Sequence, residues 1–293
     1  MRSLLPPRPE AHPDQCGRGE LPLRYEDISQ DGKIRLETIA TAESVSTWQA
    51  TLMKHPAVPQ LLARGIVPIM TRLCIEGTDG PFAVETSLDC DGCYEISHSV
   101  SAAGSVDRLF LNVWANAHAP LGRTVLPPPA NAGERRLAGR VFAEHVFTRP
   151  LAPREQRRVT VDDLIAFEEV PGPRFEQCIG PTLLRFEGDD EQASLEMDPH
   201  EICFGMRHTD SNQHVNSLVY ITLFEEAAVR HLARRGGSPQ VMGRAIEIAY
   251  RKPFFAGDRM QIAVSTRTIG DAVHAVGALF ASGADMADVS RAH

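Results

Sequence analysis

The chain lacks the features that mark several classes of protein. Its apolar runs all fall short of the roughly 18 consecutive residues that a membrane-spanning helix requires, so no membrane span is expected. Lysine occurs only at Lys33, Lys54 and Lys252, and the formal net charge of the 293 residues is −8. Because general affinity for nucleic acid needs a basic face, this charge balance argues against a nucleic-acid-binding protein.

Cysteine is sparse and scattered, with six residues in the chain. Cys90-Asp91-Gly92-Cys93 has the C-x-x-C spacing of a redox pair or of half a zinc site, but a second pair of ligands is missing. Asp91 and Gly92 favour a tight turn, so we predict the tip of a hairpin that carries two incidental thiols. The histidines show no metal-ligand spacing either, and we expect neither a metal nor a cofactor.

The N-terminal stretch MRSLLPPRPEAHPDQC is a poor secretory signal. It contains one early arginine, and two prolines follow before any apolar core can form. We therefore expect residues 1–20 to be a flexible leader, the cysteines to be reduced and the protein to be cytoplasmic.

The remaining sequence shows the same order of elements twice. A short strand candidate and a polar turn at Gln30-Asp31-Gly32 precede residues 36–53, whose apolar positions have helical spacing. Strand-like runs separated by Gly, Asp and Ser turns follow. Farther along, a strand, a polar turn and an apolar helix that stops at Gly236-Gly237 again precede strand-like runs. Each repeat predicts an antiparallel sheet that curls around one helix, in an α+β fold.

Turn and linker signals set the boundaries of these units. We predict a first unit over residues 21–119 and a second over 196–283, followed by a polar tail at 284–293. Between them, VLPPPANAGERR has the composition of a linker, and residues 120–195 are assigned to a connecting or decorating segment. The helix of the second unit is apolar on almost every face of its first three turns, so we expect other structure to enclose it.

A polar segment lies directly before this helix. In HTDSNQHVNSLVY, from His208 to Tyr220, six of the 13 residues are His, Asp, Asn or Gln. One interpretation is structural, because Asp210 or Asn212 would cap the helix, a role that these residue types favour. The other is catalytic, and it rests on the match of the whole segment to a known pattern.

The segment Asp210-Ser211-Asn212-Gln213-His214-Val215-Asn216, followed by Tyr220 and Glu225-Glu226-Ala227, is similar to the D-x-N-Q-H-V-N-N signature of acyl-acyl-carrier-protein thioesterases. It also resembles the looser D-x-x-G-H-V-N-N-x-x-Y pattern of the acyl-CoA thioesterase superfamily. EIAYRKPFFAGDRM and RYEDISQDGKIRLETIATAESVSTW resemble further strands and the first helix of these enzymes. The chain as a whole thus resembles a double-hotdog protein, with two hotdog units in tandem, each an antiparallel sheet wrapped around a central helix.

The resemblance implies a thioesterase that hydrolyses an acyl-CoA or acyl-carrier-protein thioester, in fatty acid or polyketide metabolism. The second unit would carry the chemistry and the first would shape the acyl pocket. Asp210 would be the general base or would orient water, and His214 is the other candidate for moving the proton. Asn212 would position water or His214.

The same resemblance assigns the substrate contacts to the start of the helix. The first amides of a helix are unpaired and its dipole favours an anion, so the amides of Val215 to Leu218 would form an oxyanion hole. Val215, Asn216 and Tyr220 are the predicted substrate-binding residues.

The chain departs from the family pattern at two positions. Plant-type acyl-carrier-protein thioesterases have a further catalytic glutamate after the Y-R-x pattern, where this chain has Pro253. Glu225 or Glu226 on the helix would substitute for it, and the other would face solvent or pair with Arg230 at helical spacing. Ser217 stands where the signature usually has a second Asn.

Two further classes of function remain open. An acyltransferase or a hydratase/dehydratase can use the same fold, although Gln213 stands where hydratases have the proline of a D-x-N-P-x-H loop. A non-catalytic acyl-thioester-binding protein is the third reading, which Pro253 keeps open. The clusters RHLARR and REQRR would bind CoA phosphates or an acidic carrier protein, or would form solvated faces. Pairing into a homodimer is also left open.

Overall fold

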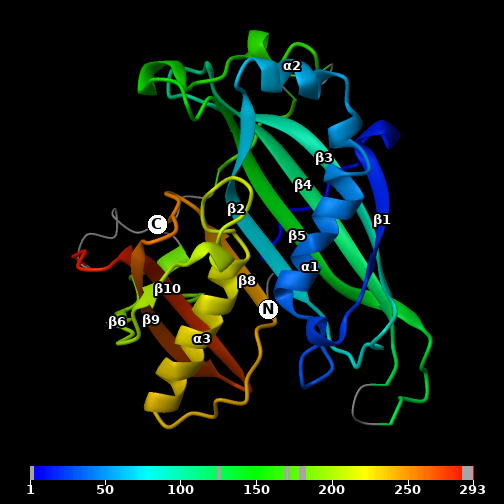
Figure 1. Ribbon diagram of the computed structural model, residues 1–293, viewed down its shortest axis with the longest axis vertical. Helices are drawn as coiled ribbons and strands as arrows, with labels where there is room; N and C mark the ends of the chain where they lie inside the picture. The colour runs from blue at the N-terminus through cyan, green and yellow to red at the C-terminus, as the bar shows by residue number, and fades with distance from the viewer. Residues whose placement is uncertain (1–2, 124–126, 168–169, 171, 178–182, 286–292) are drawn as a thin grey trace. The chain divides into compact units, whose positions relative to one another are not determined.

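A computed structural model describes residues 3–123, 127–167, 170, 172–177, 183–285 and 293 (Figure 1). The chain forms two compact units: one consists of residues 1–177 with 244–247, and the other of residues 178–243 with 248–293. No helix in the part of the chain that the structure describes is long and apolar enough to cross a membrane.

The first unit is a sheet with one long helical segment on it. The strand order is β1-β3-β4-β5-β2-β8, and the first five strands pair antiparallel. The strands are β1 (Cys16–Pro22), β2 (Val67–Gly77), β3 (Ser87–Val100), β4 (Val106–Pro120), β5 (Arg135–Thr148) and β8 (Ala245–Ala249). The helices are α1 (Leu36–Glu43), the π-helical turn η3 (Ser44–Trp48) and α2 (Ala57–Ala63), with 3-10 turns at η1 (Pro13–Gln15), η2 (Tyr25–Asp27), η4 (Leu52–Lys54), η5 (Arg154–Gln156) and η6 (Val161–Asp163).

Glycines in the sheet allow the helical segment to lie close to it. A Cβ at Gly92 on β3 would lie 2.3 Å from Thr47 Oγ1, and one at Gly139 on β5 would lie 2.7 Å from Ile39 Cδ1. Figure 1 shows α1 crossing the face of β4 and β5. Because glycine has no side chain at these two positions, the helical segment can pack closely on the sheet.

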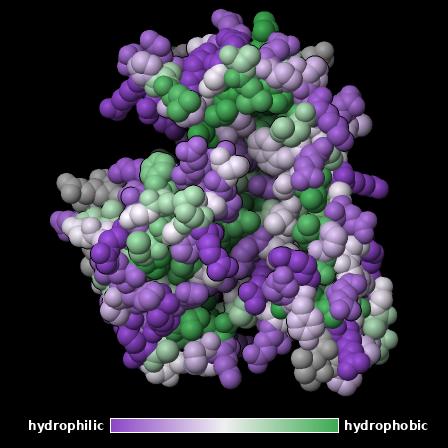
Figure 2. Space-filling view, viewed as in Figure 1, coloured by the Kyte–Doolittle hydropathy of each residue, from purple (hydrophilic) through white to green (hydrophobic). Residues whose placement is uncertain are grey.

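The second unit is smaller and has the same plan. It contains α3 (Val219–Arg234), β6 (Glu196–Met197), β7 (Ile202–Cys203), β9 (Arg259–Ile269), β10 (Ala272–Ala281) and the 3-10 turn η8 (Met206–His208). β9 pairs antiparallel with β10, β6 and β7. Of the 16 residues of α3, five are buried and three are exposed, namely Glu226, Ala233 and Arg234, so other structure covers most of its first three turns but not all of its surface. Figure 2 shows hydrophobic and hydrophilic residues side by side over the region of α3.

Two expectations about the first unit are corrected. Residues 16–22 form β1, and Leu4 and Leu5 pack against the cluster of Cys74, Cys93, Trp114 and Phe142, so the described part of the predicted leader, residues 3–20, is packed on the sheet. The alternation of small and polar residues in β1 gave too little apolar signal to be recognised as a strand. β5 is a central strand of this sheet, although residues 120–195 were assigned to a connecting segment.

The C-x-x-C segment is not a hairpin tip. Residues 90–93 lie inside β3, a strand of 14 residues, where Asp91 and Gly92 adopt extended backbone. Because side chains of a strand alternate between its two faces, Cys90 and Cys93 point to opposite sides of the sheet. This rules out a disulfide or a shared metal between these two thiols.

One buried carboxyl group makes the stability of the first unit dependent on pH. Glu43 is buried at the end of α1, and among the described residues its Oε2 has no hydrogen-bond partner. Burial raises the pKa of Glu43 from 4.5 to about 8, since the charged form is poorly solvated there. The folded protein therefore keeps a proton that the unfolded chain releases.

We expect this contribution to stability to be full below about pH 4.5 and to be lost as the pH rises to about 8. Glu43→Gln removes the titration. Within this window the free energy of unfolding of the native protein should therefore fall, relative to that of the variant, by up to about 1.4 kcal/mol per pH unit. Urea unfolding at pH 5, 6, 7 and 8 measures the difference. The exposed Glu10→Gln is the control, and a Glu43→Gln difference that is constant with pH would contradict the assignment.

Candidate active site

The polar segment before α3 forms a closed turn in the second unit. Thr209 and Val215 form an isolated antiparallel bridge, and the Asp210 N–H donates to the His214 carbonyl at 3.2 Å. Gln213 closes the turn with a φ of 67°, a left-handed conformation uncommon for a residue other than glycine. The turn thereby brings Asp210 and His214 close to each other.

The Asp210 carboxylate is held from both sides. Its Oδ1 accepts the Asn212 N–H at 2.8 Å, and its Oδ2 accepts the Asn216 Nδ2–H at 3.3 Å. The side chain is 25% exposed, so one edge of the carboxylate faces solvent. Among the residues that the structure describes, each oxygen has a single donor and therefore keeps lone-pair capacity for a water molecule.

His214 lies next to this carboxylate without a direct hydrogen bond to it. Its Nδ1 is 4.0 Å from Asp210 Oδ1 and 3.4 Å from the Val215 carbonyl oxygen. The side chain is 39% exposed. The backbone of Asn212 contacts Asp210 while its side chain is exposed, so Asn212 and His214 both border the carboxylate.

Asn216 connects the turn to the helix. Its side chain donates to Asp210 and accepts the Leu218 N–H at 2.9 Å, and its carbonyl accepts the Val219 N–H at 3.1 Å. The helix start is therefore satisfied by Asn216, and neither Asp210 nor Asn212 has the capping role considered from sequence. The orientation of the Asp210 carboxylate is fixed relative to α3 by this one side chain.

The amides predicted to form an oxyanion hole are mostly occupied. The Val215 N–H donates to the Phe254 carbonyl, the Asn216 N–H to the His208 carbonyl and the Leu218 N–H to Asn216. Among the described residues, the Ser217 N–H has no acceptor. Ser217, which directly precedes the N-cap residue Leu218, is thus the position in this stretch whose amide is left for a ligand.

Val215 and Tyr220, two of the predicted substrate-binding residues, lie in the core of the second unit. Val215 is 3% exposed and Tyr220 is 7% exposed, in a cluster with Phe204 and Phe254. Burial raises the pKa of the Tyr220 hydroxyl, although a hydrogen bond at 3.4 Å from the Phe254 N–H acts in the opposite direction. The packing of Val215 and Tyr220 in this cluster holds the turn against the core of the second unit.

The two helix glutamates have different surroundings. Glu226 is exposed and pairs with Arg230, with 3.5 Å between its Oε2 and the arginine Nη1, as the helical spacing predicted. Glu225 is half-buried and has its own interaction partners. Pro253 is exposed, and Tyr250 from the same EIAYRKPFF stretch donates its hydroxyl to the Ser217 carbonyl at 3.0 Å. Sequence reasoning recognised this stretch but did not assign Tyr250 the role of bracing Ser217.

The arginines of the RHLARR cluster are engaged within the second unit. Arg230 and Arg234 both pair with the buried Asp198, and Arg235 pairs with Glu196. Burial alone would raise the pKa of Asp198, but the hydrogen bonds from the two arginines hold it below its usual value. This cluster therefore stabilises the end of α3 and has little charge left for phosphate.

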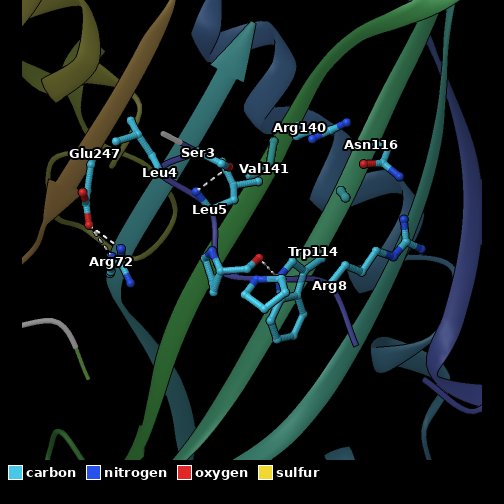
Figure 3. Close-up of a pocket in the computed structure, with 13 residues that line it drawn as sticks. Ser3, Leu4, Leu5, Arg8, Arg72, Trp114, Asn116, Arg140, Val141 and Glu247 are labelled. Atoms are coloured by element: carbon cyan, nitrogen blue, oxygen red, sulfur yellow. Dashed lines mark hydrogen bonds and ion pairs between the residues drawn. The ribbon is translucent and has the colours of Figure 1, made fainter. Parts of the chain in front are cut away.

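The first unit contains a separate open cleft of about 860 Å³ between residues 3–8 and the outer face of the sheet (Figure 3). Arg72 pairs with Glu247 and Arg8 pairs with Asp91, and the Trp114 indole donates to the Pro6 carbonyl at 3.1 Å. None of the predicted catalytic residues lines it. We therefore place the candidate site at residues 208–218.

No protein-family model matches the chain, and no curated protein matches it in sequence. Solved structures of similar fold do exist. A Lactobacillus plantarum protein provisionally described as an oleoyl thioesterase is 11% identical, with a TM-score of 0.59 over 92% of this chain and 90% of that one. The 12:0-ACP thioesterase from Umbellularia californica is 12% identical, with a TM-score of 0.58 over 92% and 90%.

An acyl-ACP thioesterase from Bacteroides thetaiotaomicron is 12% identical, with a TM-score of 0.54 over 93% of this chain and 94% of that one. At this level of identity the likeness concerns the fold. The chain has the α+β, double-hotdog fold that the sequence predicted, and it resembles acyl-ACP thioesterases over nearly its full length.

We predict that Asn216→Ala destabilises the second unit by about 1–2 kcal/mol, because it removes the acceptor of the Leu218 N–H and a donor to Asp210. Asn212→Ala is the matched control, since that side chain is exposed, and it should change the free energy of unfolding by less than about 0.5 kcal/mol. Chemical denaturation of both variants measures this. Equal stability of the two would contradict the role of Asn216.

Proposed function

We propose that the protein is a thioesterase, which hydrolyses an acyl thioester to a free acid and a thiol. The observation that supports this most directly is that the segment before α3 carries both a partly exposed carboxylate, Asp210, and a backbone N–H at Ser217 that has no acceptor among the described residues. One group can accept a proton from water and the other can stabilise a developing negative charge. The fold shared with thioesterases adds support by analogy.

Asp210 is the proposed general base. Its carboxylate is oriented by the Asn212 amide and the Asn216 side chain, and it retains lone pairs for a water molecule. His214, whose Nδ1 lies 4.0 Å from Asp210 Oδ1, is the second proposed proton carrier. Asn212 borders the same water position. In this assignment Asn216 is a positioning residue.

The proposed reaction consumes one water molecule. Its oxygen attacks the thioester carbon as Asp210 takes one of its protons, and the carbonyl oxygen becomes negatively charged opposite the Ser217 N–H. The C–S bond then breaks, the carbonyl re-forms, and the proton passes to the leaving sulfur through Asp210 or His214. A single oxyanion donor of this kind typically contributes about 3 kcal/mol to the transition state.

The proposed substrates are acyl-CoA and acyl-carrier-protein thioesters, and the first unit is proposed to contribute to acyl binding. Glu225, which is half-buried and engaged, is the better candidate of the two helix glutamates for a supporting role, because Glu226 is exposed and pairs with Arg230. The proposal also includes a role in fatty acid or polyketide metabolism, a cytoplasmic location and assembly into a homodimer.

The first test is release of free thiol from a panel of acyl-CoAs and acyl-carrier proteins. We expect the native protein to be active, and Asp210→Asn and His214→Ala to lower kcat by about 100-fold or more, as loss of a general base does. Asp189→Asn, which removes a surface ion pair with Arg267, is the matched control and should keep full activity.

Absence of thiol release from every thioester would overturn the proposal. An acyl group recovered on an added acceptor would then identify an acyltransferase, and a hydrated or dehydrated acyl-CoA would identify a hydratase. Binding of acyl-CoA without any product would leave a non-catalytic binding protein.

The role of the Ser217 amide has a separate test. Ser217→Pro removes the N–H, and we expect it to lower kcat by about 100- to 1000-fold, whereas Ser217→Ala keeps the N–H and should stay within a few-fold of native. Thermal unfolding of both variants checks that the fold is retained. Equal activity of the two folded variants would exclude this amide as the oxyanion donor.

A further inference from the structure

Two cysteines that are far apart in sequence lie opposite each other in the first unit. Cys16 on β1 and Cys93 on β3 are direct partners in the antiparallel register. Directly paired residues of an antiparallel ladder point to the same face of the sheet. The Cys16 Sγ also contacts the Ala11 carbonyl at 3.9 Å, and Ala11 packs against the cluster that contains Cys93, which agrees with this placement.

The spacing of this pair suits a disulfide. Directly opposed residues in an antiparallel pair have Cα atoms about 4.5 or 5.5 Å apart, and disulfides form at Cα separations of about 4.4–6.8 Å. The Cys16 N–H donates to the Pro13 carbonyl instead of to β3, so the ladder is open at this end. Both thiols are free in the structure.

The environments of the two thiols differ. Cys16 is exposed, whereas Cys93 is fully buried beside Trp114 and Phe142. The Arg8 Nε–H donates to Cys93 Sγ at 3.2 Å, and Arg8 also pairs with Asp91 at 2.6 Å. Figure 3 shows the Arg8 side chain extending over the sheet from residues 3–8. Burial raises the pKa of the Cys93 thiol, and the guanidinium of Arg8 acts in the opposite direction by favouring the thiolate, which is the nucleophilic form.

We propose that Cys16 and Cys93 are a redox pair, which closes to a reversible disulfide when the exposed Cys16 meets a small-molecule disulfide, with Arg8 assisting Cys93. The inference rests on strand register, exposure and the Arg8 contact, and it is independent of the proposed hydrolase activity.

The chemistry proceeds in two exchange steps. The Cys16 thiolate attacks the small disulfide, forms a mixed disulfide and releases one small thiol. The Cys93 thiolate then attacks Cys16 Sγ, which forms the Cys16–Cys93 bond and releases the second thiol. The two protein thiols are oxidised by two electrons, the small disulfide is reduced by two, and the two protons end on the released thiols. Cys93 then no longer offers Arg8 a thiolate.

The test is oxidation of the folded protein with glutathione disulfide, followed by digestion without reductant and mass spectrometry. We expect one product in which the peptides of Cys16 and Cys93 are linked, and which reverts on addition of dithiothreitol. Cys90→Ser is the matched control and should form the same link, because Cys90 faces the other side of β3. In Cys93→Ser, Cys16 should remain as the glutathione mixed disulfide.

A native protein that stops at the Cys16 mixed disulfide would overturn the proposal, and so would a link from Cys93 to any cysteine other than Cys16. The same oxidation in 8 M urea should lose the preference for this pair, because the register that creates it is absent.

The part played by Arg8 is measured by the rate of the second step. If Arg8→Ala raises the pKa of the Cys93 thiol by about one unit, the thiolate fraction falls about tenfold while its nucleophilicity rises about threefold, so the rate near neutral pH should fall about threefold. The pH profile of this step should shift upward, and Arg8→Lys should restore part of the rate. Arg18→Ala, which removes an exposed arginine of β1, is the control. An unchanged rate and profile in Arg8→Ala would exclude its assistance.

Discussion

The candidate site depends on the side chain of Asn216. One amide group joins a carboxylate in the turn to the first amide before α3, with contacts of 3.3 Å to Asp210 and 2.9 Å from Leu218. Because the same residue satisfies both neighbours, the direction of the Asp210 carboxylate and the start of the helix are set together. The left-handed Gln213 and the buried Tyr220 and Val215 then support a geometry that Asn216 defines.

The fold was predictable from sequence to the level of two α+β units because the helical and strand periods are strong in residues 36–53 and in the segments around α3. β1 and β5 were not recognised, for different reasons. β1 has glycines where the helical segment approaches, so it lacks the apolar residues that identify a strand. β5 follows a proline-rich linker, and its apolar residues fit a strand or a short helix equally well.

In the site, the residue types were predictable and their hydrogen-bond partners were not. The signature identified Asp210, Asn212 and His214, and the structure brings them to one turn, while their catalytic roles stay a proposal. The expected oxyanion hole spanned Val215 to Leu218, but an amide is available only if no carbonyl lies opposite it. The Phe254 carbonyl occupies the Val215 amide through a contact distant in sequence, and the His208 carbonyl occupies the Asn216 amide across the turn, so the availability of the Ser217 amide depends on how the chain folds.

For the cysteines too, the relevant neighbours are set by the folded structure and not by spacing along the chain. Spacing along the chain suggested Cys90 and Cys93 as a pair, but the two-residue period of an extended strand sends thiols three positions apart to opposite faces. Register across strands instead brings Cys16, 77 positions from Cys93 in sequence, to the same face. A C-x-x-C spacing carries chemical meaning only on a turn or a helix start, where both thiols can meet one partner. Within a strand, the relevant neighbour of a cysteine is the residue opposite it in the ladder.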